Sequence, residues 1–179
     1  MRIVHLVRDS RGVSYSFEKV RKRPGDRNGS EYMHRHNVLV SALLWNMDNL
    51  LAEFLGGRAQ GYHRVRYQEL VRAPKSTVRR LLNGTTGADI EDPAPHVSEG
   101  SVDVSGQHIL AGNPMRFQDG RLPLREDREW IERMSPAKRR MVSLVTAPLL
   151  RRYGYPPDMQ EKATQTVLAQ GELMAGEWA

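Results

Sequence analysis

The sequence contains no cysteine, and that absence removes two kinds of chemistry at once. The chain forms no disulfide, and it offers no thiolate to a zinc or iron–sulfur centre. The redox state of the compartment in which the protein works is therefore left open by its composition.

Long hydrophobic runs are also missing. No stretch of about twenty consecutive apolar residues occurs, so we expect no membrane span. The amino terminus enters an apolar strand directly and has no signal-peptide pattern, which favours a cytoplasmic location. The sequence shows no internal repeat, and 179 residues suffice to bury one sizeable core.

Negatively charged residues are fewer than positively charged ones. The formal net charge is +6, and arginine greatly outnumbers lysine. A basic chain favours anionic partners such as nucleotides, phosphate or sulfate esters, acidic glycans or nucleic acid. The chain lacks a helix-turn-helix, a zinc finger and an RNP-type aromatic pattern, so a nucleic-acid-binding module is the remotest alternative and no nucleic-acid partner is expected.

The first seventeen residues carry the clearest site. The apolar run 3–7 predicts a buried strand, and a helix is expected to start near Ser10. Ligands bind at such strand ends in open α/β sheets, where helix N–H groups favour an anion. Arg8 offers a charged fork and Ser16 a hydroxyl, and together they suit one phosphate. The alternative is that Arg8 pairs with Asp9 or Glu18 and that Ser16 is an ordinary surface serine.

The segment RIVHLVRDSRGVSYS resembles the part of the sulfotransferase family that holds the 3′-phosphate of PAPS (3′-phosphoadenosine 5′-phosphosulfate). In that family an apolar strand precedes Arg-Asp-Pro-Arg, and a serine follows eight residues after the first arginine. Arg8 and Ser16 match this spacing, and Ser10 stands where the family usually has proline. The resemblance implies that both residues bind the cofactor.

A second block, RYQELVRAPKSTVRRLL, follows a β-prone segment at 62–67. It resembles the family pattern R-Y-E-D-L-x-x-x-P-x-x-T-x-x-x-L-L, in which the tyrosine contacts adenine. Tyr67 matches that tyrosine; the alternative is a core tyrosine with a bonded hydroxyl. Glu69 is expected to pair with Arg66 or to lie at a helix start. Ala73 replaces the usual aspartate, so the helix beginning at Pro74 lacks a side-chain cap worth on the order of 1 kcal/mol.

A third block, GNPMRF, resembles a motif of a bacterial sulfotransferase branch. By analogy with the basic, glycine-containing loop of other members, Arg116 would join the 3′-phosphate site, with the backbone of Gly112 and Asn113 close to the nucleotide. Glycine permits such close approach.

The resemblance implies an α/β fold, with a P-loop NTPase-like three-layer parallel sheet flanked by helices. The family's amino-terminal strand, its 5′-phosphosulfate loop and the helix after it are not found in this sequence. We therefore interpret residues 1–157 as the carboxyl-terminal part of a sulfotransferase domain and 158–179 as a peripheral helical tail.

The implied activity is transfer of a sulfuryl group from PAPS to an acceptor hydroxyl or amine, with PAP as the product and no metal. The acceptor, which could be a carbohydrate, a glycolipid or another small molecule, and the oligomeric state are left open. No catalytic base is assigned: His34, His36, His63 and His108 are candidates by residue type alone. The principal alternative is a non-catalytic remnant that binds PAP or PAPS.

The remaining pattern predicts a long helix from Val38 to Leu55. The resemblance implies that Trp45 and Asn46 on this helix pack near the nucleotide; the favoured alternative is that Trp45 lies in the core and Asn46 is solvated. Gly84 is expected to end the preceding helix, and 84–107 to form a long loop. A helix starting at Pro136 is expected to kink or break at Pro148.

Overall fold

The computed structural model describes residues 1–20, 32–91, 96–104, 120–126 and 128–155. Two sheets occur in this part of the chain. The first pairs β1 (Arg2–Val7) with β2 (Gly61–Arg66) in parallel, with Val7 opposite Arg66. The second is antiparallel and has the order β3 (Val97–Ser98), β4 (Ser101–Asp103), β5 (Arg121–Pro123).

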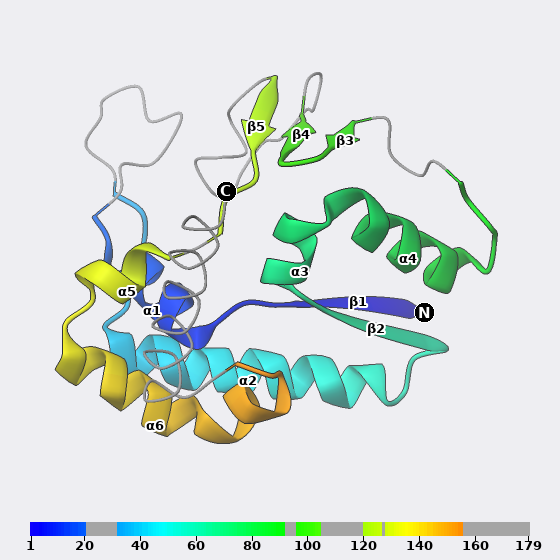
Figure 1. The fold of residues 1–179 in the computed structure, drawn as a ribbon. Coiled ribbons are helices and arrows are strands. Elements are labelled where there is room, and N and C mark those ends of the chain that lie inside the picture. The colour runs from blue at the N-terminus through cyan, green and yellow to red at the C-terminus, as the bar shows by residue number, and fades with distance from the viewer. Residues whose placement is uncertain (21–31, 92–95, 105–119, 127, 156–179) are drawn as a thin grey trace, which may run out of the picture.

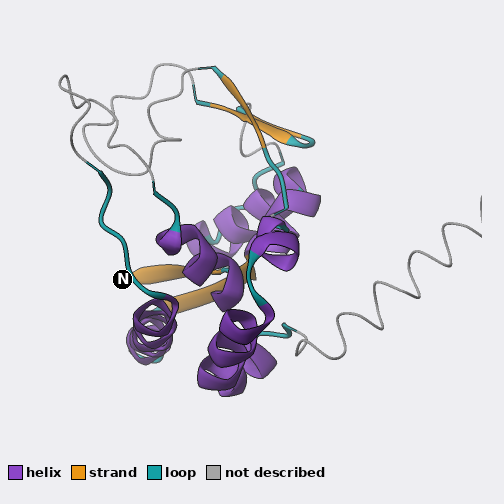
Figure 2. Ribbon diagram, turned by 90° about the vertical axis from the view of Figure 1, so that its left-hand side faces the viewer, coloured by secondary structure: helices purple, strands orange, loops and turns teal. Residues whose placement is uncertain are grey.

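Helices lie on both faces of the parallel sheet (Figure 1). Helices α2 (Val38–Gly56) and α6 (Pro136–Arg152) lie on one face, and α3 (Tyr67–Arg72) and α4 (Pro74–Thr86) on the other. Helices α1 (Ser10–Glu18) and α5 (Glu129–Arg133) lie beyond the carboxyl end of β1. Figure 2 shows the two strands with helices on either side of them. The described residues thus form a mixed α/β structure, and the larger P-loop-like parallel sheet stays a prediction.

Most predicted elements are present at their expected places. The strand at 3–7, the helix from Ser10 and the long helix from Val38 are confirmed. Trp45 is buried, as predicted, whereas Asn46 is half-buried and donates a hydrogen bond from Nδ2 to the Val145 carbonyl. The prediction that Asn46 is simply solvated is therefore wrong, because α6 packs against this side of α2.

Two helix ends that the sequence suggested are not found, at Gly84 and at Pro148, whereas a kink at Pro148 stays a prediction. Gly84 lies inside α4, which continues until Gly87 adopts a left-handed φ of 76°. Glycine is needed at 84 for packing, because a Cβ there would lie 2.5 Å from Cε1 of His63. Pro148 lies inside α6 without ending it. The carbonyl that it leaves without a partner belongs to Leu144, which is 77% exposed, so water can hydrate it.

The predicted loop at 84–107 also needs correction. Its described part contains the rest of α4 and the short strands β3 and β4, which pair around Gly100. Tyr67 is the first residue of α3 and does not end the strand before it.

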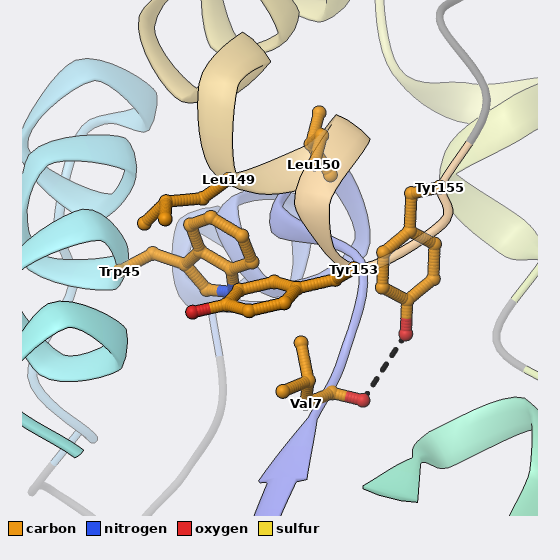
Figure 3. Close-up of a cluster of buried hydrophobic side chains, with 6 residues drawn as sticks. All are labelled: Val7, Trp45, Leu149, Leu150, Tyr153 and Tyr155. Carbon is orange, nitrogen blue, oxygen red and sulfur yellow. Dashed lines mark hydrogen bonds between the residues drawn. The ribbon is translucent and has the colours of Figure 1, made fainter. Parts of the chain in front are cut away.

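One core cluster joins the carboxyl end of β1 to α2 and α6 (Figure 3). Its members are Val7, Trp45, Leu149, Leu150, Tyr153 and Tyr155. The Tyr155 hydroxyl donates a 3.1 Å hydrogen bond to the carbonyl of Val7, which fixes the chain after α6 against the strand end. Burial raises the pKa of Tyr155, so this hydroxyl stays protonated at neutral pH.

The buried His5 on β1 connects the parallel sheet to helix α2 through hydrogen bonds. Asn49 donates from Nδ2 to the Trp45 carbonyl, so its Oδ1 is left to accept from Nε2 of His5 at 2.8 Å. The other ring nitrogen of His5 therefore accepts from the Tyr62 hydroxyl at 2.6 Å. This chain of hydrogen bonds ties β1, β2 and α2 together.

Gly56 at the end of α2 lies directly against the ring of Tyr62 on β2. A Cβ at Gly56 would lie 2.3 Å from Cδ2 of Tyr62, a ring that His5 already holds in place. We predict that Gly56→Ala lowers the free energy of unfolding by about 1–3 kcal/mol through overpacking. Urea unfolding measures the change.

Gly57→Ala is the matched control for this prediction. Gly57 has a right-handed helical φ of −65°, and a Cβ there would meet atoms only at 3.7 Å. This variant should be neutral or slightly stabilising. Equal loss of stability in both variants would contradict the close approach of Gly56 to Tyr62.

Candidate anion-binding site

The turn after β1 is held by a buried ion pair. Arg11 is fully buried, and its Nε and Nη2 donate to the two carboxylate oxygens of Asp9 at 2.9 and 2.6 Å. Its guanidinium lies over the Trp130 ring, with Cζ 4.4 Å from the ring centroid. Asp9 also accepts from the backbone N–H of Arg11, which caps α1.

This arrangement corrects one part of the predicted site. We expected the helix start to attract an external anion, but the carboxylate of Asp9 already caps it. The expected alternative pairing of Arg8 with Asp9 gives way to the pairing of Asp9 with Arg11. The charge of Asp9 at this helix start therefore disfavours a second anion beside it.

The structure brings two of the predicted ligands, Arg8 and Tyr67, close together. Arg8 follows the last residue of β1 and Tyr67 follows the last residue of β2, and these two strands pair in register. The guanidinium carbon of Arg8 lies 5.8 Å from the centre of the Tyr67 ring, within cation–π range. The Tyr67 hydroxyl donates to the Arg125 carbonyl at 3.0 Å, so it is bonded as in the alternative interpretation, but the residue is only half-buried and is not part of the core.

Of the other predicted cofactor ligands, only Ser16 belongs to the described residues. Ser16 lies on α1 and is half-buried. Arg116, Gly112 and Asn113 lie outside the described residues. Their assignment as cofactor ligands, like that of Arg8, Ser16 and Tyr67, stays a prediction.

Sequence reasoning missed a larger group of arginines beside Tyr67. We call it the arginine surface. It comprises Arg8, Arg66, Arg72, Arg80, Arg125 and Arg128, with the carboxylates Glu69 and Glu126 among them.

Two carboxylates form ion pairs with four of these arginines. Glu69 accepts from Arg66 at 2.7 Å and from Arg80 at 3.1 Å, as the predicted pairing of Glu69 with Arg66 required. Hydrogen bonding from Arg66 lowers the pKa of Glu69, so it remains charged at neutral pH. Glu126 lies 2.5 Å from Arg72 and 3.7 Å from Arg128. The surface therefore keeps a positive excess.

Most of these guanidinium groups are open to solvent. The side chains of Arg72, Arg80 and Arg128 are 70%, 63% and 61% exposed. Ion pairs so exposed contribute little to stability, and a phosphate can compete with the carboxylates for them.

A hollow of about 560 Å³ lies at the junction of α3 and α4, within the arginine surface. The start of α4 faces it without a side-chain cap, as the alanine at 73 predicted. The hollow is lined by Glu69, Arg72, Ala73, Ser76, Thr77 and Arg80. Uncapped N–H groups beside arginines favour negative charge.

A metal is not indicated by the described side chains. Among the described residues, no group of three or more His, Asp or Glu side chains is placed to hold an ion. His34 and His36 lie together, with ring centroids 4.6 Å apart. His63 lies on β2 against α4, and His108 is outside the described residues.

Helix α2 qualifies the expectation of no membrane span. Its 19 residues are long and apolar enough to cross a bilayer by length and composition alone. One such helix is weak evidence, because a core helix of a globular protein passes the same test, and one face of α2 is packed within the molecule.

The central turn gives a stability prediction. Arg11→Met leaves Asp9 buried without its partner, which we expect to cost about 3–5 kcal/mol of unfolding free energy. The double variant Asp9→Asn with Arg11→Met removes both charges and should lose less. Urea unfolding of the two variants measures the difference.

Arg133→Met is the control for an exposed pair. Arg133 bonds Glu129 at 3.2 Å with a side chain that is 69% exposed, so its loss should cost below about 1 kcal/mol. If Arg11→Met cost no more than Arg133→Met, the buried pair would not hold the turn.

Comparison with known proteins gives one partial match. Residues 129–177 match a family model described as type I restriction enzyme HindI endonuclease subunit-like, C-terminal. The described part of this match comprises α5, the Ser135 cap and α6. No curated protein and no solved structure matches the chain.

This match overturns the identification made from the sequence. The match of residues 129–177 is to the carboxyl-terminal part of a restriction-enzyme subunit and not to the sulfotransferases, so the identification as a PAPS-dependent sulfotransferase is wrong. The alternative of a non-catalytic remnant that binds PAP or PAPS is not supported by this match either. The resemblance was carried by short strand–turn–helix segments, whose residue types also serve structural roles here. PAPS as a cofactor is not tested by the described residues.

Proposed function

We propose that the arginine surface binds DNA through its phosphate groups. The observation that carries this proposal is the excess of exposed arginines over the two carboxylates among them, at the carboxyl ends of β1 and β2. Arginine forks match phosphate oxygens in geometry and charge. A spread of several such groups suits a polyanion better than a single phosphate does.

The family match supports DNA as the polyanion. A protein described as a restriction endonuclease subunit acts on DNA. The match covers residues 129–177, so it supports the kind of partner, and the arginine surface itself lies before the matched residues. The overall charge of +6 agrees with an anionic partner. The earlier expectation of no nucleic-acid partner is replaced by this proposal, which concerns binding and assigns no strand cleavage.

The test is a salt titration of duplex DNA binding, followed by fluorescence anisotropy. We expect log K to fall linearly with log salt concentration, as counterion release requires. The double variant Arg72→Gln with Arg128→Gln should bind more weakly, and its salt slope should fall by about 2, one for each lost phosphate contact. Both side chains are more than half exposed, so folding should be retained.

A matched control changes the net charge equally at other places. Arg58 follows α2, at the opposite end of β2 from the arginine surface, and Arg133 pairs with Glu129 on α5. Arg58→Gln with Arg133→Gln should leave the slope nearly unchanged. Equal losses in the two double variants would show that binding follows net charge alone and would overturn the proposed site.

A second experiment distinguishes DNA from a small phosphate ligand. Inorganic phosphate and 3′-phosphoadenosine 5′-phosphate are titrated separately by calorimetry, with Arg8→Gln as the variant. We expect only weak binding of each, because neither spans the surface. Tight binding of the nucleotide without binding of DNA would overturn DNA as the partner.

Position 73 allows a test that keeps side-chain shape constant. Ala73→Asp places a carboxylate at the uncapped start of α4, whereas Ala73→Asn places a neutral amide of the same shape there. We predict that the aspartate variant binds DNA several-fold more weakly than the asparagine variant, because the added charge repels phosphate. Equal DNA affinities of the two variants would show that the hollow at the start of α4 is not part of the DNA-binding site.

A further inference from the structure

Helix α2 has two apolar faces, and only one of them is packed within the described structure. The packed face carries Val38, Ala42 and Trp45. On the opposite side are five large apolar side chains, which we call the outer seam. They are Val40, Leu43, Met47, Leu50 and Phe54, exposed by 38%, 54%, 55%, 51% and 55%.

The spacing of the outer seam indicates the kind of partner. Successive members are separated by three, four, three and four residues, which is the repeat that packs one helix against another. Leu39, Leu51 and Leu55 widen the seam and are also about half exposed. The total apolar area is on the order of several hundred Å², close to the roughly 800 Å² that each partner contributes to a stable interface.

The charges on α2 favour another protein helix over a lipid surface. Helix α2 has no lysine or arginine, and its two charged residues, Asp48 and Glu53, are both acidic. Helices that bind anionic membrane surfaces carry basic residues on their polar faces.

A groove beside the seam adds a second observation. It has a volume of about 240 Å³ and lies between α2 and α6, with Leu50 shared between groove and seam. The groove is lined by Asn46, Leu50, Val145, Pro148, Leu149 and Arg152. A flexible, unbranched side chain such as methionine fills a space of this kind.

We infer that the outer seam joins two copies of this chain into a dimer, with the two α2 helices antiparallel. A two-fold axis between Met47 and Leu50 places Met47 of one copy beside Leu50 and the groove of the other. The same axis sets Leu43 against Phe54. The antiparallel arrangement is favoured because it brings the flexible Met47 side chain to the groove beside Leu50, whereas a parallel arrangement would set Met47 against Met47.

The test is the mass of the full chain in solution, measured by light scattering and sedimentation over a range of concentrations. We expect twice the chain mass of 20.4 kDa. The double variant Met47→Glu with Leu50→Glu should be monomeric, with a dissociation constant raised on the order of 100-fold or more by the buried like charges. Circular dichroism checks that it stays folded.

Leu144→Glu is the matched control, because Leu144 is 77% exposed on α6 and is not part of the seam. It should remain dimeric. A monomeric wild-type chain, or a dimer that survives the double seam variant, would overturn the proposal.

Orientation and lipid binding are tested separately. The chain has no cysteine, so Leu43→Cys and Phe54→Cys chains can be mixed and oxidised. Crosslinking between the two variants supports the antiparallel dimer, and crosslinking of Leu43→Cys to itself contradicts it. Flotation of a monomeric chain with phosphatidylcholine–phosphatidylglycerol vesicles would assign the seam to lipid and overturn the dimer.

Discussion

The structure depends on the buried ion pair between Asp9 and Arg11. Two charges out of water are tolerated only when each is fully hydrogen-bonded. Here the carboxylate accepts from the guanidinium and from the start of α1, while the guanidinium lies on Trp130 of α5. The pair thereby fixes the angle between β1 and α1.

The turn beside this pair is also where the other helices are attached. Trp45 of α2 donates from Nε1 to the Arg8 carbonyl at 3.0 Å. Thr146 of α6 donates to the Val142 carbonyl, so its oxygen accepts from the Ser10 hydroxyl at 2.7 Å. Because the backbone of residues 7–11 is held from several sides, the Arg8 side chain starts from a fixed point at the edge of the arginine surface.

Local signals predicted most of the fold. The apolar run at 3–7, the periodic pattern from Val38 and the Ser135–Pro136 cap each specify an element without distant contacts. The errors came where tertiary packing decides. Gly84 does not end a helix; it leaves room for the ring of His63, which a Cβ at this position would overlap. Pro148 is tolerated inside α6 because Leu144, whose carbonyl loses its hydrogen bond, is exposed to solvent.

The site was predicted less well, for a physical reason. Arg8 and Tyr67 were singled out because they match short family motifs, and the structure brings them together because the strands that precede them pair in parallel. Arg72, Arg80 and Arg128 were missed because no periodic pattern links α3, α4 and the start of α5. Their sharing of Glu69 and Glu126 follows only from the packing of these elements.

The most direct measurement of the central claim is an NMR titration with duplex DNA that follows the arginine Nε–Hε signals. If the arginine surface binds phosphate, the signals of Arg72, Arg80 and Arg128 shift together and saturate, while those of Arg58 and Arg133 do not move. Uniform small shifts of all exposed arginines, or shifts confined to Arg58 and Arg133, would contradict it.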